Sequence, residues 1–295
     1  MKIIFLGTSG MQPTKDRNQS GIYLSYGNTK LLIDCGEGIQ RQMNITGLKV
    51  PKLNKILITH LHGDHILGLG GLIFNLCANE FKGTLEIYGP RGIKEYYKNM
   101  INFCCVERIK IIIKEIKEGK VYEDKLYKVF CKKLKHTSLC YGFRFEEKPR
   151  RKMNLDYLKK IGLIQNPLIG ELQRGKDILW RGKKIRVKDA TYLIKDKKIA
   201  FVLDTAYCKN AVKLSRGVDI LVCECTFLDE KKKKEEYNHL DANDVAKIAN
   251  EANVEKVVVT HFSQRYKNTD MIKNKIKKIF KKEVVCAKDF LELNL

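Results

Sequence analysis

Short apolar runs rich in β-branched residues recur along the chain and predict buried β-strands. Near the N-terminus such runs cover 2–7, 21–26 and 29–34, with Gly27-Asn28 predicting a hairpin between the last two. Further strands are expected at 55–58, 84–88, 109–113, 128–134, 141–145, 199–203, 218–223, 256–259 and 283–287. Helices are expected after Asp34–Gly38 as far as Thr46, and at 66–81, 91–106, 206–216, 242–252 and 270–281. Hairpins in the first half and strand–helix alternation in the second are both satisfied by two packed sheets with helices outside.

One stretch, residues 146–188, interrupts the strand pattern. It contains Pro149, Pro167 and the only tryptophan, Trp180. It also holds 13 basic and 5 acidic residues, a local net charge of +8. We therefore expect a single domain over residues 1–295 that carries a flexible inserted arm at 146–188.

The densest chemistry lies in Thr59-His60-Leu61-His62-Gly63-Asp64-His65, between the strand expected at 55–58 and the helix expected at 66–81. His60 and His62 are two positions apart, so in an extended segment both side chains point the same way. Asp64 and His65 turn with the chain toward a second point. The spacing favours two adjacent metal ions over one. A polar loop with solvated histidines is the alternative, but it does not account for four such side chains so close together.

Three later residues extend this cluster. Asp204 and His261 each follow an apolar strand directly, and His136 lies in the loop between two predicted strands. Taken alone, each is explained by capping or packing. Because ligands converge at strand ends along one sheet edge, we expect two metal sites. His60, His62 and His136 would hold one ion, Asp64, His65 and His261 the other, with Asp204 bridging. Nitrogen and oxygen donors suit zinc and, less tightly, manganese or iron.

Asp34, at the end of a predicted strand, has two candidate roles. Its carboxylate can cap the following helix or orient a neighbouring metal-bound histidine. The residues do not choose between them, and one side chain can do both.

Charge narrows the choice of partner. The 295 residues include 57 Lys and Arg against 34 Asp and Glu, a formal net charge of +23. Such an excess indicates a polyanionic partner such as nucleic acid, although a lysine-rich proteome is an alternative explanation. At the metal site, two divalent ions exceed the charge of Asp64, Asp204 and a hydroxide by about one unit, which favours an anionic substrate such as a phosphodiester.

The rest of the composition indicates where in the cell the protein is located. Hydrophobic residues make up 44%, enough for a sizeable core, and no apolar run is long enough to span a bilayer. The N-terminus reads as a strand, not as a signal peptide, and ten cysteines include no Cys-x-x-Cys pair. We expect a cytoplasmic protein with no membrane association.

The metal-binding pattern carries a family resemblance. His60-x-His62-x-Asp64-His65, followed by His136, Asp204 and His261, resembles the metallo-β-lactamase superfamily. That resemblance implies an α/β (α+β) fold, a four-layer αββα sandwich, and usually a dinuclear zinc centre. It does not choose the substrate.

Further motifs indicate the substrate. Pro13-Thr14-Lys15-Asp16-Arg17-Asn18 resembles the Pro-x-Lys-x-Arg-Asn loop of the tRNase Z (ribonuclease Z) family. His136-Thr137-Ser138 resembles its His-Ser-Thr motif with the last two residues exchanged, and Cys223-Glu224-Cys225-Thr226 keeps the Glu and Thr of its His-Glu-Ala-Thr motif. His239 stands where the family has a further, non-ligand histidine. The arm resembles the family's tRNA-binding exosite, with Asn166-Pro167 at the Gly-Pro position. The match covers essentially the whole chain and is that of the short form.

This resemblance implies a zinc-dependent endoribonuclease that removes the 3′ trailer of precursor tRNA after the discriminator nucleotide and leaves a 3′-hydroxyl. It implies two zinc ions per chain, with Mn²⁺ or Fe²⁺ as substitutes. Asp64 would accept the proton of the attacking water, and His239, polarised by Glu224, would protonate the leaving oxygen. The alternative for His239 is a helix-capping loop histidine beside Asp241.

The resemblance also implies how RNA is held. Lys15, Arg17 and Asn18 would contact RNA near the cut, and Arg150, Arg151 and Lys152 would grip the tRNA. A homodimer is implied, in which the arm of one subunit serves the other.

Three alternatives remain. Another hydrolase on this fold, such as a phosphodiesterase, thioesterase or lactonase, does not need the basic arm. A non-catalytic RNA-binding protein predicts decayed metal ligands, whereas all seven are present. An mRNA-processing nuclease of the superfamily resembles a longer chain with an inserted cap domain, for which 295 residues leave no room.

Overall fold

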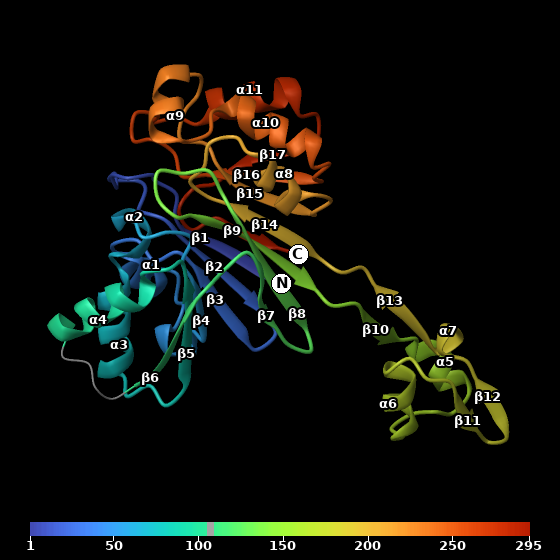
Figure 1. The fold of residues 1–295 in the computed structure, drawn as a ribbon. Helices are drawn as coiled ribbons and strands as arrows, with labels where there is room; N and C mark the ends of the chain where they lie inside the picture. Colours follow the sequence, from blue (N-terminus) through green and yellow to red (C-terminus); the bar gives the residue numbers. More distant parts are fainter. Residues whose placement is uncertain (105–108) are drawn as a thin grey trace. The chain divides into compact units, whose positions relative to one another are not determined.

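Two seven-stranded sheets face each other, and helices cover their outer faces (Figure 1). The computed structural model describes residues 1–104 and 109–295. The first sheet has the order β18-β1-β2-β3-β4-β5-β6: Glu292–Asn294, Lys2–Gly7, Gly21–Tyr26, Thr29–Ile33, Lys55–Leu57, Thr84–Gly89 and Lys110–Glu115. The second has the order β17-β16-β15-β14-β9-β8-β7: Glu283–Cys286, Lys256–Thr260, Ile220–Glu224, Lys198–Val202, Tyr141–Glu147, Tyr127–Lys133 and Gly119–Glu123.

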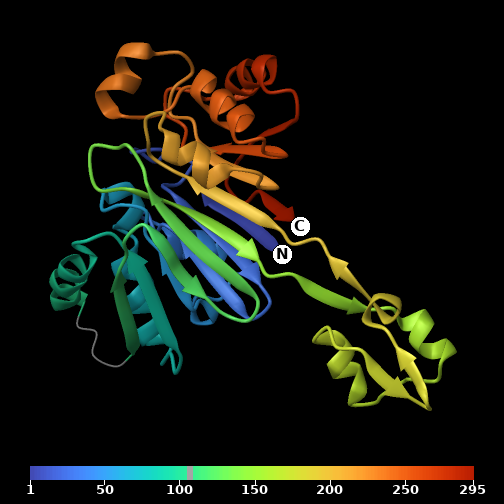
Figure 2. The same cartoon turned by 45° about the vertical axis from the view of Figure 1, so that its right-hand side comes forward.

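The helices divide between the two sheets. The segments that connect strands of the first sheet contain α1 (Ile39–Ile45), a 3₁₀ turn at Val50–Lys52, α2 (Gly63–Ile66), α3 (Leu69–Ala78) and α4 (Ile93–Cys104). On the side of the second sheet lie α8 (Lys209–Ser215), α9 (Lys231–Tyr237), α10 (Ala242–Glu251) and α11 (Asp270–Ile279) (Figure 2). This is the four-layer αββα sandwich expected for the metallo-β-lactamase fold.

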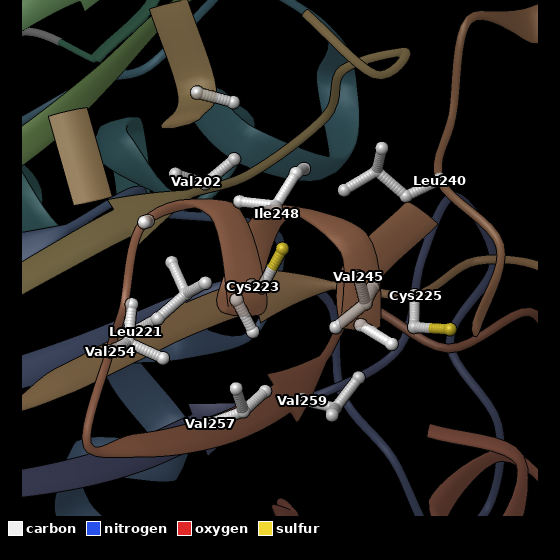
Figure 3. Close-up of a cluster of buried hydrophobic side chains, with 14 of the residues drawn as sticks. Val202, Leu221, Cys223, Cys225, Leu240, Val245, Ile248, Val254, Val257 and Val259 are labelled. Atoms are coloured by element: carbon white, nitrogen blue, oxygen red, sulfur yellow. The ribbon is translucent and has the colours of Figure 1, made fainter. Parts of the chain in front are cut away.

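Strand alternation builds a core on both faces of each sheet. In β1, Ile4 and Leu6 join the cluster under α1 and α3. Between the sheets, Tyr26 of β2 meets Phe145 of β9 edge to face, with ring centroids 5.8 Å apart. Beyond the second sheet, Val202, Leu221, Cys223, Val257 and Val259 pack beneath Val245 and Ile248 of α10 (Figure 3).

Parallel pairing brings the ends of several strands to one edge. Val202 of β14 lies beside Cys223 of β15, which lies beside Val259 of β16. In the first sheet, Ile33 of β3 lies beside Leu57 of β4. The residues that follow these strands are therefore gathered along the same edges.

Most predicted elements are confirmed, but the helix expected over 66–81 is shorter than expected and is broken near its start. The structure has two helices there, α2 and α3, separated at Leu67-Gly68. The backbone N–H of Gly68 donates to the carbonyl of Cys35 at 2.9 Å. A side chain at Gly68 would place its Cβ only 2.0 Å from the carbonyl oxygen of Gly36. The break thus lets two backbones approach closely.

Other boundaries also differ. The helix expected from Ala206 starts only at Lys209, because the Ala206 N–H donates to the Lys135 carbonyl at 2.7 Å. The expected end of the helix at Val106 lies outside the described residues. Outside residues 146–197, the elements that were not predicted are the 3₁₀ turn at Val50–Lys52, β7, β18 and α9. No helix in the described part of the chain has both the length and the apolar character needed to cross a bilayer.

Residues 124–128 and 146–197 form a second compact unit. Its elements are β10 (Arg150–Met153), α5 (Leu155–Lys160), α6 (Leu168–Gln173), β11 (Ile178–Trp180), β12 (Lys183–Ile185), α7 (Val187–Ala190) and β13 (Thr191–Ile194). Leu158, Leu163, Leu172 and Ile178 form its own small core. The unit extends past residue 188, the expected end of the arm, because β13 is the antiparallel partner of β10.

Candidate metal centre

Histidine and aspartate side chains from four segments meet where strands of both sheets end. His60 to His65 follow β4, His136 follows β8, Asp204 follows β14 and His261 follows β16. Their ligand atoms form two groups: His60, His62, His136 and Asp204 in one, and Asp64, His65, His261 and Asp204 in the other. The structure therefore brings together all seven residues predicted as ligands, in the two groups predicted.

The second group has the spacing of a tetrahedral metal site. The Nε2 atoms of His65 and His261 are 3.3 Å apart, and Asp64 Oδ2 lies 3.3 Å from each. Asp204 Oδ2 is 3.4 Å from His65 Nε2, and Asp204 Oδ1 is 3.2 Å from His261 Nε2. Ligand atoms about 2.0 Å from a tetrahedral ion are about 3.3 Å from one another. These donors fit a divalent metal ion without rearrangement.

The first group is slightly more open. His62 Nδ1 lies 3.0 Å from His60 Nε2 and 3.2 Å from His136 Nε2. Asp204 Oδ2 is 3.6 Å from His60 Nε2 and 3.9 Å from His136 Nε2. Asp204 Oδ1 is buried and, although it lies 3.2 Å from His261 Nε2, makes no well-aligned hydrogen bond with any described residue. A buried anionic oxygen of this kind is costly unless a cation neutralises it.

Burial and charge set the protonation of these groups. Burial alone would raise the pKa of Asp204, but the charges of His261 and His65 hold it well below its usual range. Burial lowers the pKa of His60 well below its ordinary value, so this ligand is neutral. Burial also lowers the pKa of His65, but Asp204, Asp34 and Asp64 together raise it well above the usual value. A metal ion would take the place of that proton, since metal binding displaces protons from its ligands.

Asp34 orients a histidine and does not cap α1. Its Oδ2 lies 2.7 Å from His65 Nδ1, and its carboxylate accepts bonds from the N–H and hydroxyl of Thr59 at 2.7 and 2.8 Å. The residue at the N-cap of α1 is Gly38. Of the two roles left open by the sequence, the structure shows the orienting one.

The other imidazoles are held in the same way. The Thr59 hydroxyl lies 3.0 Å from His60 Nδ1, and the Thr226 hydroxyl 3.1 Å from His261 Nδ1. His136 Nδ1 donates to the carbonyl of Asn238 at 3.2 Å. Such outer hydrogen bonds fix the tautomer and ring orientation of a ligating histidine.

His239 lies beside the centre and is paired with Glu224. Its Nδ1 is 2.8 Å from Glu224 Oε1, and its ring stacks near that of His261 at a centroid distance of 5.6 Å. Burial lowers the pKa of His239, but the charge of Glu224 outweighs this and raises it to about 9. The alternative role in helix capping is wrong, because the side chain of Asp241 caps α10.

Glu224 is itself fully buried and fixed. Its Oε1 accepts the Thr205 N–H at 2.8 Å, and its Oε2 accepts the Thr226 hydroxyl at 2.7 Å. Both neighbours lie next to strand ends that carry the centre. Glu224 therefore holds the His239 ring in one place relative to the metal-binding residues.

The residues proposed to contact RNA are not equally free. The Arg17 guanidinium donates to the carbonyls of Tyr266 and Lys267, and the Asn18 amide donates to the Glu37 carbonyl at 2.7 Å. Lys15, two residues before Arg17, is exposed. Arg150, Arg151 and Lys152 lie on β10 in the second compact unit. In this structure Arg17 and Asn18 thus shape the loop, and Lys15 is its exposed cation.

Sequence reasoning missed one carboxylate that supports this loop. Asp289 accepts the Thr8 hydroxyl and the Asn18 N–H, both at 2.7 Å, and the Gln42 amide at 2.9 Å. Thr8 in turn accepts the Phe262 N–H at 2.9 Å, next to His261. Asp289 stands alone in the C-terminal segment, so no motif or spacing could have revealed it.

Comparison with known proteins identifies the family. A family model described as Beta-lactamase superfamily domain matches residues 174–262, and one described as Anti-Pycsar protein Apyc1 matches residues 1–100. Ribonuclease Z of Nocardia farcinica is 34% identical over 298 residues, covering 100% of this chain and 97% of the relative. Ribonuclease BN of Escherichia coli is 38% identical over 280 residues, covering 90% of each chain.

Solved structures agree with these relatives. Human tRNase Z, short form, superposes with a TM-score of 0.71 and 25% identity, covering 100% of this chain and 99% of its own. The metallo-β-lactamase fold protein YhfI from Bacillus subtilis, at 19% identity, has a TM-score of 0.73 and shares the fold. From its full-length identity to these relatives and its arrangement of donors, the chain belongs to the ribonuclease Z family.

Proposed function

We propose that this protein is a metal-dependent endoribonuclease that removes the 3′ trailer of precursor tRNA after the discriminator nucleotide. The observation that carries the proposal is full-length identity of 33–38% to ribonuclease Z and BN chains, in a chain that keeps a complete seven-residue donor set. Water adds to phosphorus while the bond from phosphorus to the 3′-oxygen breaks. The tRNA then ends in a 3′-hydroxyl, and the trailer begins with a phosphate.

The cofactor we propose is a pair of zinc ions per chain, with Mn²⁺ or Fe²⁺ as possible substitutes. Two donor groups that share Asp204 support two ions, and nitrogen-rich donors about 3.3 Å apart support zinc. When bound, such ions would polarise the phosphodiester and lower the pKa of the attacking water.

Two side chains would then move protons. The Asp64 carboxylate is buried, and its Oδ2 lies 3.3 Å from the Nε2 atoms of both His65 and His261. We assign Asp64 as the acceptor of the proton of the attacking water. His239 is assigned as the donor to the departing 3′-oxygen. The raised pKa keeps His239 protonated near neutral pH, and its bond to Glu224 fixes which nitrogen faces the carboxylate. The other nitrogen, Nε2, is left to give its proton.

RNA would be held mainly by positive charge. Lys15 is exposed in the loop at 8–18, and Arg17 and Asn18 hold that loop in place. The second compact unit carries Arg150, Arg151 and Lys152, and we propose that it is the tRNA-binding exosite. A surface that neutralises several phosphates binds tRNA through shape and charge.

We also propose a homodimer and a cytoplasmic location. Three large apolar side chains near α1 and α3 are more than half exposed: Ile45 (52%), Leu67 (58%) and Phe74 (59%). A second copy of the chain would cover them. We infer the cytoplasmic location from the proposed substrate, precursor tRNA.

Other hydrolase activities on this fold, and a purely RNA-binding role, are the alternatives. The complete donor set with its outer hydrogen bonds argues against a non-catalytic protein. The test is to incubate the zinc-loaded protein with a 3′-extended precursor tRNA, with and without a chelator. One cut after the discriminator, abolished by the chelator and restored by zinc, is expected. Hydrolysis of thioesters or lactones without RNA cleavage would overturn the proposal.

A further inference from the structure

A pocket of about 280 Å³ opens beside His239. Eight residues line it: Lys135, Ala206, Tyr207, Lys234, Glu235, Asn238, His239 and Asp244. Its volume lies just below the usual range for small-ligand sites, which suits one nucleotide and no more. Apart from His239 and the backbone carbonyl of Asn238, which holds the His136 ring, none of its lining residues has a role in the function proposed above.

The pocket shares its walls with the metal centre. Lys135 and Ala206 are chain neighbours of His136 and Thr205, and the Ala206 N–H donates to the Lys135 carbonyl at 2.7 Å. The Asn238 carbonyl accepts from His136 Nδ1 at 3.2 Å. A phosphodiester held at the metals would therefore have one of its flanking nucleotides within reach of this pocket.

The pocket offers an immobilised aromatic ring. The Tyr207 hydroxyl donates to Glu251 Oε2 at 2.7 Å, and Lys247 Nζ lies 4.1 Å from the ring centroid. A ring held at its hydroxyl and by a cation loses little freedom when a base stacks on it.

The pocket lining includes two lysines, Lys135 and Lys234, and two carboxylates, Glu235 and Asp244. Lys234 Nζ lies 2.7 Å from both Asp241 Oδ2 and Asp244 Oδ2, so its charge is already neutralised. Lys135 is exposed and makes no ion pair with any described residue. Its ammonium can meet the phosphate or ribose of a nucleotide whose base lies against Tyr207.

We propose that this pocket holds the discriminator nucleotide, the last nucleotide of the tRNA product, with its base on Tyr207 and its backbone near Lys135. This inference rests on the proposed function. His239 borders the pocket, and it is the group assigned to protonate the departing 3′-oxygen. That oxygen belongs to the discriminator nucleotide, so the pocket serves that side of the scissile bond and not the trailer side.

The test is a cycle that combines protein variants with base deletions in the RNA. Three precursor tRNAs are compared: intact, abasic at the discriminator and abasic at the first trailer nucleotide. They are cut by the zinc-loaded wild type, Tyr207→Ala, Tyr207→Phe and a control, Tyr237→Ala, whose side chain is half exposed outside the pocket. Each kcat/KM is divided by that enzyme's rate on a small aryl phosphodiester.

We expect loss of the discriminator base to lower kcat/KM of the wild type, Tyr207→Phe and Tyr237→Ala by about 5- to 150-fold. In Tyr207→Ala the same deletion should have little further effect, while deletion of the trailer base should act equally in all four enzymes. If Tyr207→Ala binds less zinc than wild type, Tyr207→Leu takes its place. A full discriminator effect in Tyr207→Ala would overturn the proposal, as would coupling of Tyr207 to the trailer base. Failure of the wild type to cut intact precursor would contradict the proposed function instead.

Discussion

Asp34 Oδ2 lies 2.7 Å from His65 Nδ1 in a fully buried contact at the base of the metal centre. Asp34 has a φ of 58°, in the left-handed region, as do the centre residues Asp204 at 39° and His261 at 57°. Three residues that follow strands thus adopt an unfavourable backbone conformation. Such strain at a site persists where the surrounding structure enforces it.

This contact leads to the first prediction. Asp34→Asn removes the charge but tolerates the left-handed backbone, because Asn is among the residues that adopt it most readily. We expect zinc affinity to fall about 10- to 100-fold, since outer partners of ligating histidines have effects of that size. Competitive zinc titration measures it, with exposed Asp229→Asn as control. Equal affinities of the two variants would contradict the orienting role.

The second prediction concerns Asp204, which belongs to both donor groups. Asp204→Ala should reduce the metal content from the proposed two ions per chain to one or none. It should lower activity by more than about 100-fold, the upper end of the effect expected for a residue that only orients a ligand. Elemental analysis of the freshly purified variant tests this. Retention of two ions would mean that Asp204 does not bridge the groups.

The third prediction separates proton donation from metal binding. His239→Ala should keep its zinc and its fold but lose precursor cleavage by roughly 10²- to 10⁴-fold. Loss of zinc in this variant would make His239 a ligand. Cleavage at the wild-type rate would give it no part in the reaction.

A fourth prediction follows from the pKa of about 9 at His239. The protonated form is the donor, so the cleavage rate should fall as pH rises through about 9. Glu224→Gln removes the charge that raises this pKa, and the fall should then occur at lower pH. The pH profiles of both enzymes test the pairing. An unchanged profile in Glu224→Gln would show that His239 does not limit the rate at high pH.

The last prediction concerns the second compact unit. Met153 pairs with Thr191 at the end of β10 and β13, so residues 154–190 can be replaced there by a short turn. That segment has nine basic and four acidic residues. Hydrolysis of a small aryl phosphodiester should persist, while precursor tRNA should bind more weakly and with a shallower dependence on salt. Equal loss of both activities would instead give the unit a role in the fold of the centre.

Most residues of the metal centre could be predicted because they come directly after strands that the sequence itself predicts. Apolar runs mark β4, β14 and β16, and the residues after them fall at shared edges by parallel pairing. The break between α2 and α3 was not visible, since it depends on a backbone contact between Gly68 and Cys35, which are far apart in sequence. The role of Asp289 was hidden for the same reason: its partners Thr8, Asn18 and Gln42 come from the other end of the chain.

The fold of the second compact unit, in contrast to the metal centre, could not be predicted from the sequence. Its basic composition was plain, but its small core uses scattered apolar residues such as Leu158, Leu172 and Ile178. Short helices and three-residue strands leave no strong periodicity, so the sequence indicated an arm and not a folded unit.

The most direct test of the account is the chemistry of the two ends produced from a 3′-extended precursor tRNA. The zinc-loaded protein should release a tRNA that ends at the discriminator nucleotide with a 3′-hydroxyl, and a trailer with a 5′-phosphate. Ligation and mass spectrometry of both fragments identify these groups. A 2′,3′-cyclic phosphate on the tRNA, or a cut elsewhere in the RNA, would contradict hydrolysis at the proposed bond.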